Sequence, residues 1–362
     1  MNSPENAAFP AGIAGPSLWY LVLYAVTLLL HAAFMNYVLC GSIVLAIAGV
    51  RGGGAMRTVS RVGKDWLPSA LSGAITAGIA PLLFVQILYQ QEYYTANLLS
   101  FHRWMAILPV LIAAYYMLYF VKAKRLAAHP RIQAALAACV AACMVFVAWS
   151  WVENHLLSLD RGAWSRQYAE GRMVYASAAI LPRLAFFVLA AVPMWAMLLA
   201  AQLRAGATGT TPDEARAAMR PLAVAAIAAM AGAAAIAMPV LCGPLATAGV
   251  EAASQDAWRL VLLAGGAIAV AGWTRIAVRR VFAGLGAQAA IAGTLAFWLA
   301  VIAIRESTRW AIAGRANTIE RHAEVGTTAG LVVFVVFLAA GIGVTAWIWL
   351  RVARALNPAP RR

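Results

Sequence analysis

Long apolar runs constrain this chain more than any other feature of its sequence. A stretch of about 20 apolar residues crosses the hydrocarbon core of a bilayer as a helix, at ~1.5 Å per residue. Charged residues make up only 11% of the 362 residues, against about a quarter in soluble domains. We therefore predict an all-α polytopic membrane bundle of about nine transmembrane helices. The expected spans are 18–50, 68–91, 103–121, 133–152, 174–203, 220–245, 257–275, 281–304 and 326–350.

The distribution of charge predicts the topology. The formal net charge is +15, and 18 of the 28 Lys and Arg residues fall in the connections on one side: 51–67, 121–132, 203–220, 275–280 and the tail from 351. An excess of Lys and Arg marks cytoplasmic loops. We therefore expect a short outer N-terminal segment (1–17), a bundle over 18–352 and a basic cytoplasmic tail (353–362). The basicity is a topology signal, so we expect membrane lipid and no nucleic acid as a partner.

Acidic residues are expected to be absent from the span interiors. In the eighth span the only acid is Glu306, which we place at the outer boundary of 281–304. Ionisable groups inside a membrane mark ion or proton paths. The pattern therefore disfavours a pump that uses buried carboxylates.

Histidine is scarce, and His31 lies near the middle of the first expected span. An imidazole there is either a satisfied packing residue or an axial ligand of haem iron. His102 and His155, at the outer ends of the third and fourth spans, are either capping residues or ligands. His322 is expected in an outer loop and His129 on the cytoplasmic surface.

Two arginines on the outer side are candidate anion ligands. Arg183 lies about 10 residues into the fifth span, where its charge needs an anion, a carbonyl cage or a route to the interface. Arg259, at the outer start of the seventh span, either extends to the interface or pairs with a carboxylate. No C-x-x-C-H motif occurs, which excludes covalent c-type haem attachment to this chain.

Four segments resemble cytochrome bd oxidase subunit I in the same order along the chain. HAAFMNYVLCGSIVLAI (31–47) is similar to the first span, in which a histidine ligates haem, and AWSWVENH (148–155) to the end of the fourth span. DAWRLVLLAG (256–265) is similar to an F-R-x-M-x-G segment, and RESTRWAIAG (305–314) to an E-x-x-R-x-x-W-A-I segment. The span count and the outer N-terminus agree with that family. The resemblance implies a respiratory haem protein of a bacterial inner membrane.

The departures from that family are equally informative. The fifth span has no histidine, and Val261 stands where the family has a methionine ligand. The outer loop that binds quinol is cut to about 10 residues around Glu251 and Asp256. The usual quinol site and low-spin haem ligands are therefore expected to be absent.

From the resemblance we expect one or two b-type haems in a protein of electron transfer, with oxygen reduction as an open further role. His31 would be an axial ligand, with His102 or His155 as a second, and Arg183 and Arg259 would hold propionates. Electrons would come from a periplasmic cytochrome c or a second membrane subunit. Three alternatives stay open: a haemless scaffold subunit, a small-solute transporter, and a copper site built from His102, His155 and His322.

Overall fold

The computed structural model describes residues 15–172, 174–237, 253–313, 332–333, 335–344 and 346–347. Every regular element in these ranges is a helix. The chain divides into a compact unit of residues 22–314 and a second unit made of residues 1–21 and 315–362. Outside the larger unit, the described residues include a short apolar helix, Val335–Val344, within the ninth predicted span.

Eight of the described helices are long and apolar enough to cross a membrane. This finding bears out the prediction of a polytopic helical bundle, and the remainder of the span predicted at 326–350 lies outside the described residues. The eight helices are α1 (Gly15–Arg51), α2 (Gly54–Leu88), α4 (Phe101–Lys122), α5 (Pro130–Leu159), α7 (Ile180–Arg204), α8 (Pro212–Ala237), α9 (Ala253–Arg279) and α10 (Gly284–Ala313).

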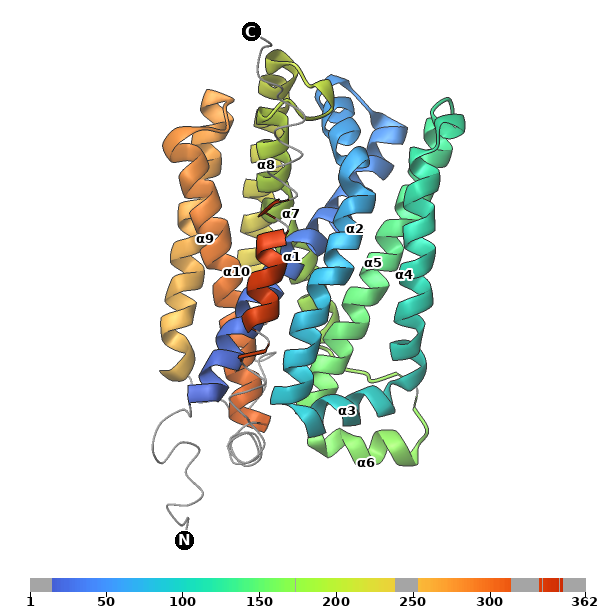
Figure 1. Ribbon diagram of the computed structural model, residues 1–362, viewed down its shortest axis with the longest axis vertical. Coiled ribbons are helices and arrows are strands. Elements are labelled where there is room, and N and C mark those ends of the chain that lie inside the picture. Colours follow the sequence, from blue (N-terminus) through green and yellow to red (C-terminus); the bar gives the residue numbers. More distant parts are fainter. Residues whose placement is uncertain are drawn as a thin grey trace. The chain divides into compact units, whose positions relative to one another are not determined.

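Two shorter helices lie across one end of the larger unit, which we call the α3/α6 end (Figure 1). They are α3 (Gln90–Leu99) and α6 (Arg161–Ala169), and they contact each other. The α6 helix begins where the Asp160 side chain accepts a hydrogen bond from the Ala163 amide at 3.1 Å, a standard N-cap. These two segments had been expected as plain connections.

Aromatic side chains gather beside α3. The Tyr93 and Trp151 rings both pack near Trp104, with centroids 5.7 and 4.8 Å from it, and the Arg103 guanidinium lies 5.0 Å from the Trp149 ring. Amphipathic rings of this kind concentrate at membrane–water interfaces. The α3/α6 end is therefore the level at which the larger unit meets one membrane surface.

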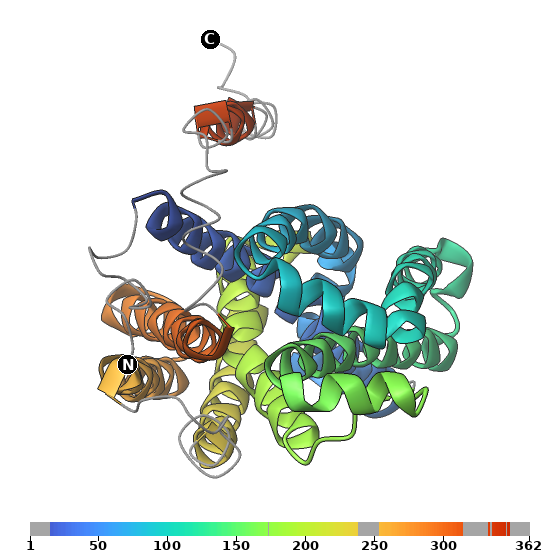
Figure 2. The same ribbon diagram turned by 90° about the horizontal axis from the view of Figure 1, so that it is seen from below.

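Glycine sets the closest helix contacts. A Cβ on Gly272 of α9 would lie 2.3 Å from the Ala290 amide nitrogen of α10, and one on Gly293 would lie 2.3 Å from the Ala269 nitrogen. Small residues allow this approach of backbones, which is how helices pack in lipid. Figure 2 shows α9 and α10 side by side along their length. The α7 helix is the most buried of the eight spans, and its Ala190 carbonyl accepts a hydrogen bond from Trp298 Nε1 at 3.1 Å.

Candidate functional site

A buried ion cluster joins α1, α5 and α10. Its members are Tyr24, His155, Glu306 and Arg309, each less than a tenth exposed. The Tyr24 hydroxyl donates to Glu306 Oε1 at 3.1 Å. Arg309 Nη1 donates to both carboxylate oxygens of Glu306, at 3.2 and 3.3 Å, because residues three apart share one face of α10. The cluster thus ties the first span to the eighth.

Arg309 is the centre of this cluster. Its Nη2 lies 3.0 Å from His155 Nδ1, and its Cζ lies 4.8 Å from the centre of the Tyr89 ring. A guanidinium only donates hydrogen bonds, so His155 Nδ1 is the acceptor. The neutral His155 ring therefore carries its proton on Nε2. Neither ring nitrogen of His155 therefore has a free lone pair, because Nδ1 accepts from Arg309 and Nε2 carries the proton.

Three arginines lie close enough to His155 for their charges to act on it. The charges of Arg183, Arg305 and Arg309 all act on this imidazole. Arg305 Nε lies 3.9 Å from Glu306 Oε1, and among the described residues Glu306 is the carboxylate bonded within this group. Low-dielectric surroundings strengthen the resulting potential.

A second set of polar contacts holds α3, α4 and α6 around the end of α5. Glu153 is fully buried, forms an ion pair with Arg103 and accepts a hydrogen bond from the Tyr175 amide at 2.7 Å. Glu92 of α3 pairs with Arg161 of α6. These bonds tie α3, α4 and α6 to one another and to the end of α5.

Two tyrosines at this end keep their protons at neutral pH. Burial raises the pKa of Tyr89 well above its ordinary value, and the nearby Glu306 carboxylate adds to the effect. Burial and a 2.9 Å hydrogen bond from its hydroxyl to Asp160 raise the pKa of Tyr175 to about 12. The Tyr175 hydroxyl therefore remains a donor to Asp160 at neutral pH.

The expectation that the helix interiors hold no acidic residue is wrong. Glu92, Glu153 and Glu306 are buried, the last two within α5 and α10. The reason is helix length: α5 continues to Leu159 and α10 to Ala313, beyond the predicted ends at 152 and 304. The spacing of Glu306 and Arg309, opposite charges three residues apart, is the signal in the sequence that indicates this pair.

His31 lies on α1 against α2. Its Nδ1 is 2.8 Å from the Ala74 carbonyl oxygen, which can only accept, so Nδ1 carries the proton and Nε2 is left as an acceptor. A Cβ on Gly78 would lie 2.9 Å from the imidazole, so only glycine leaves room for the ring in this position. One helical turn on, Phe34 occupies a similar notch at Gly73.

The other predicted site residues divide between the clusters and the surface. Arg183 is buried on α7 near His155, as a charge that needs an anion would be. His102 is exposed in the first turn of α4, and His129 is exposed before α5. Arg259 donates to Asp256 at 3.0 Å. His322 and Glu251 lie outside the described residues.

In the described ranges, His, Cys, Asp and Glu form no group of three that is arranged to hold a metal ion. Cys139 is exposed and Cys143 is half-buried on α5, while Cys40 is buried on α1. The copper site predicted from three histidines stays a prediction, because His322 falls outside those ranges. No protein-family model and no curated protein matches the chain.

Proposed function

We propose that this chain is a membrane haem protein of respiratory electron transfer, related to cytochrome bd oxidase subunit I, in which His31 is the axial ligand of a b-type haem. The observation that carries the proposal is the state of the His31 ring. Its Nδ1 donates to the Ala74 carbonyl, and its Nε2 is left with a lone pair. Metal-ligating histidines almost always anchor their other nitrogen in this way.

The described residues fit one axial ligand better than two. His155 accepts from Arg309 through Nδ1 and carries its proton on Nε2, so ligation would require the cluster to reorganise. His102 is exposed at the start of α4, and no described contact joins it to His31. We therefore propose a single haem with one protein ligand from this part of the chain. Such a group supplies one-electron transfer, and an open axial position suits a small ligand such as oxygen.

The cations at the α3/α6 end suit the haem propionates. Arg183 and Arg305 both place positive charge beside His155, and Arg305 Nε lies 3.9 Å from Glu306 Oε1. To bind a propionate, Arg259 would have to break its hydrogen bond to Asp256. The role of the Glu306–Arg309 pair is to hold these groups in place and to keep water out.

The topology completes the proposal. With the basic connections in the cytoplasm, the α3/α6 end faces the periplasm of a bacterial inner membrane. Only residues 238–252 separate α8 from α9, so the chain lacks the sequence of an extended quinol-binding loop there. Electrons would then come from a periplasmic cytochrome c or a second membrane subunit.

The visible spectrum of the purified protein, oxidised and dithionite-reduced, tests the proposal. We expect a Soret band with α and β bands, and loss of haem in His31→Ala. His129→Ala, exposed before α5, is the control that leaves haem content unchanged. Haem retained in full by His31→Ala would refute the assignment.

Gly78 gives a second test that leaves His31 itself in place. In Gly78→Ala the added Cβ meets the imidazole at 2.9 Å, so the ring must move and the haem spectrum or content should change. Gly63→Ala is the matched control on the same helix, because a Cβ there meets no atom within 4 Å. Identical spectra for the two variants would contradict the placement of His31.

A haemless scaffold is the second candidate. The observation that favours it is that the His31 ring already has a hydrogen bond and a closely fitting notch without iron. A folded, colourless protein from cells supplied with haem would establish this reading in place of the first.

A further inference from the structure

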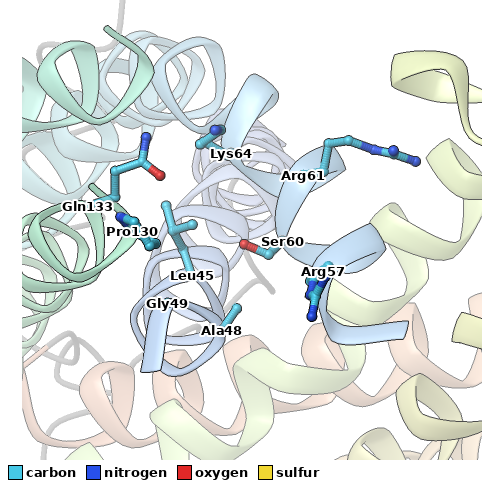
Figure 3. Close-up of a pocket in the computed structure, with 9 residues that line it drawn as sticks. All are labelled: Leu45, Ala48, Gly49, Arg57, Ser60, Arg61, Lys64, Pro130 and Gln133. Atoms are coloured by element: carbon cyan, nitrogen blue, oxygen red, sulfur yellow. The ribbon is translucent and has the colours of Figure 1, made fainter. Parts of the chain in front are cut away.

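A small pocket opens at the end of the larger unit opposite α3 and α6, between the end of α1 and the starts of α2 and α5. Its volume is about 170 Å³. Leu45, Ala48 and Gly49 of α1 form an apolar wall, and α2 contributes Arg57, Ser60, Arg61 and Lys64 (Figure 3). Pro130 and Gln133 of α5 complete the lining.

The walls of the pocket are fixed by close packing. A Cβ on Gly49 would lie 2.7 Å from the Pro130 carbonyl oxygen and 2.6 Å from the Ala134 Cβ, so α1 and α5 meet directly there. Gln133 Nε2 donates to the Val121 carbonyl at 2.9 Å, which anchors that side chain to the end of α4. The pocket is therefore part of the packed bundle and does not depend on a loop.

Its charge is strongly positive. Arg61 is paired with Glu214 of α8 at 2.9 Å, and Figure 3 shows its side chain extending away from Gln133. Arg57 Nε donates to the Gly52 carbonyl at 3.2 Å, which leaves the other guanidinium nitrogens available. Among the described residues the Lys64 ammonium makes no hydrogen bond or ion pair. Two positive charges at this pocket are thus without a carboxylate partner.

We propose that this pocket binds a phosphate group, and that an anionic phospholipid supplies it. Basic pockets between transmembrane helices on the cytoplasmic side are suited to lipid headgroups. The volume lies below the ~300 Å³ of sites that enclose a whole drug-sized ligand, so it holds a headgroup and leaves the acyl chains outside. The Ser60 hydroxyl, which points toward Leu45 in Figure 3, is available as a further donor.

The apolar surroundings favour a lipid over a free ion. Ile47, Met56 and Ile132, each next in sequence to a lining residue, are exposed large hydrophobic side chains. Acyl chains attached to a bound phosphate would cover such side chains. A soluble phosphate ion would leave them bare.

Thermal denaturation of the full-length protein in neutral detergent tests the proposal. Phosphatidylglycerol should raise the midpoint saturably, whereas phosphatidylcholine and inorganic phosphate should not. The variant Arg57→Gln/Lys64→Gln should weaken the apparent affinity for phosphatidylglycerol about 30-fold, from roughly fivefold for each charge removed. The control Lys124→Gln/Arg125→Gln removes two exposed charges from the connection between α4 and α5 and should keep the wild-type affinity.

Three results would overturn the proposal. Equal weakening in the control variant would assign the effect to diffuse charge, and an equal shift with inorganic phosphate would assign the pocket to a free ion. If phosphatidylglycerol and phosphatidylcholine raise the denaturation midpoint of the wild-type protein equally, the pocket is not a site for an anionic headgroup. If the double variant is not monodisperse, Lys64→Gln alone carries the test, with about fivefold weakening expected.

Discussion

Replacing Arg309 by methionine removes the group that holds Glu306, His155 and Tyr24 together. The Glu306 carboxylate would lose two hydrogen bonds of 3.2 and 3.3 Å, and His155 Nδ1 would lose its donor. Removing one partner of a buried ion pair costs about 3–5 kcal/mol, because it leaves an uncompensated charge. Glu306 keeps the Tyr24 hydroxyl and the more distant Arg305, so we expect the lower part of that range, about 3 kcal/mol.

The partner substitution should cost less. Glu306→Gln keeps an oxygen that accepts from Arg309, so the buried guanidinium loses the carboxylate charge but keeps a hydrogen bond. A loss of about 1.5–3 kcal/mol is expected, the value of a hydrogen bond to a charged group. The double variant should then lose less than the sum of the two single changes, by about 2 kcal/mol, because neither charge is stranded.

Equilibrium unfolding in mixed micelles with a denaturing detergent, followed by tryptophan fluorescence, measures these free energies. The matched control is Arg61→Met, which breaks the exposed pair with Glu214, whose side chains are 43% and 36% accessible. Exposed pairs contribute at most about 1 kcal/mol. Additivity of Arg309→Met and Glu306→Gln within ~0.5 kcal/mol would refute the coupling. A loss of stability in Arg61→Met equal to that in Arg309→Met would refute the assumption that burial makes the Arg309 pair the stronger one.

Two further predictions concern packing and pH. Gly272→Val should destabilise the bundle by at least about 1–3 kcal/mol, because its Cβ would lie 2.3 Å from the Ala290 backbone. Gly286→Ala, whose Cβ would make contacts of 3.4 Å, should be tolerated. The same unfolding assay measures both variants. Tyr175 has a folded pKa of about 12, above the ordinary value near 10, so its contribution to stability is complete below pH 10 and is lost as the pH rises through 12. Tyr175→Phe should flatten that part of a stability–pH profile, and an unchanged slope would show that the Asp160 contact does not matter.

Hydropathy predicts the spanning helices because each has to bury its backbone in an apolar medium. The expected span at 103–121 corresponds to α4 at Phe101–Lys122, and 18–50 corresponds to α1 at Gly15–Arg51. The short helices α3 and α6 were not predicted, because their mean hydropathy is too low to mark a span. Contacts with α5 hold α3 and α6 in place, and the local sequence of the two helices does not encode those contacts.

The ion cluster was only partly predictable. His155 and Arg183 were singled out as polar residues near a membrane, which the buried positions of both support. Tyr24 was missed, since its partner Glu306 lies 282 residues away and a single sequence gives no sign of that pairing. His31 was identified by its isolation in an apolar helix, but the Ala74 carbonyl and the Gly78 notch became visible only with α2 in place.

Arginine has different roles at the two ends of the bundle, and the burial of its side chain determines the role. Arg57 and Arg61 are exposed at the basic end, where water screens them and a lipid phosphate would replace that water. Arg183 and Arg309 are withdrawn from water at the α3/α6 end, where each charge must be matched by an anion, a dipole or a bound group. Counting charges along the sequence therefore predicts the topology. The chemistry depends on where each helix places its cations, and α7 and α10 hold Arg183 and Arg309 in the interior of the protein.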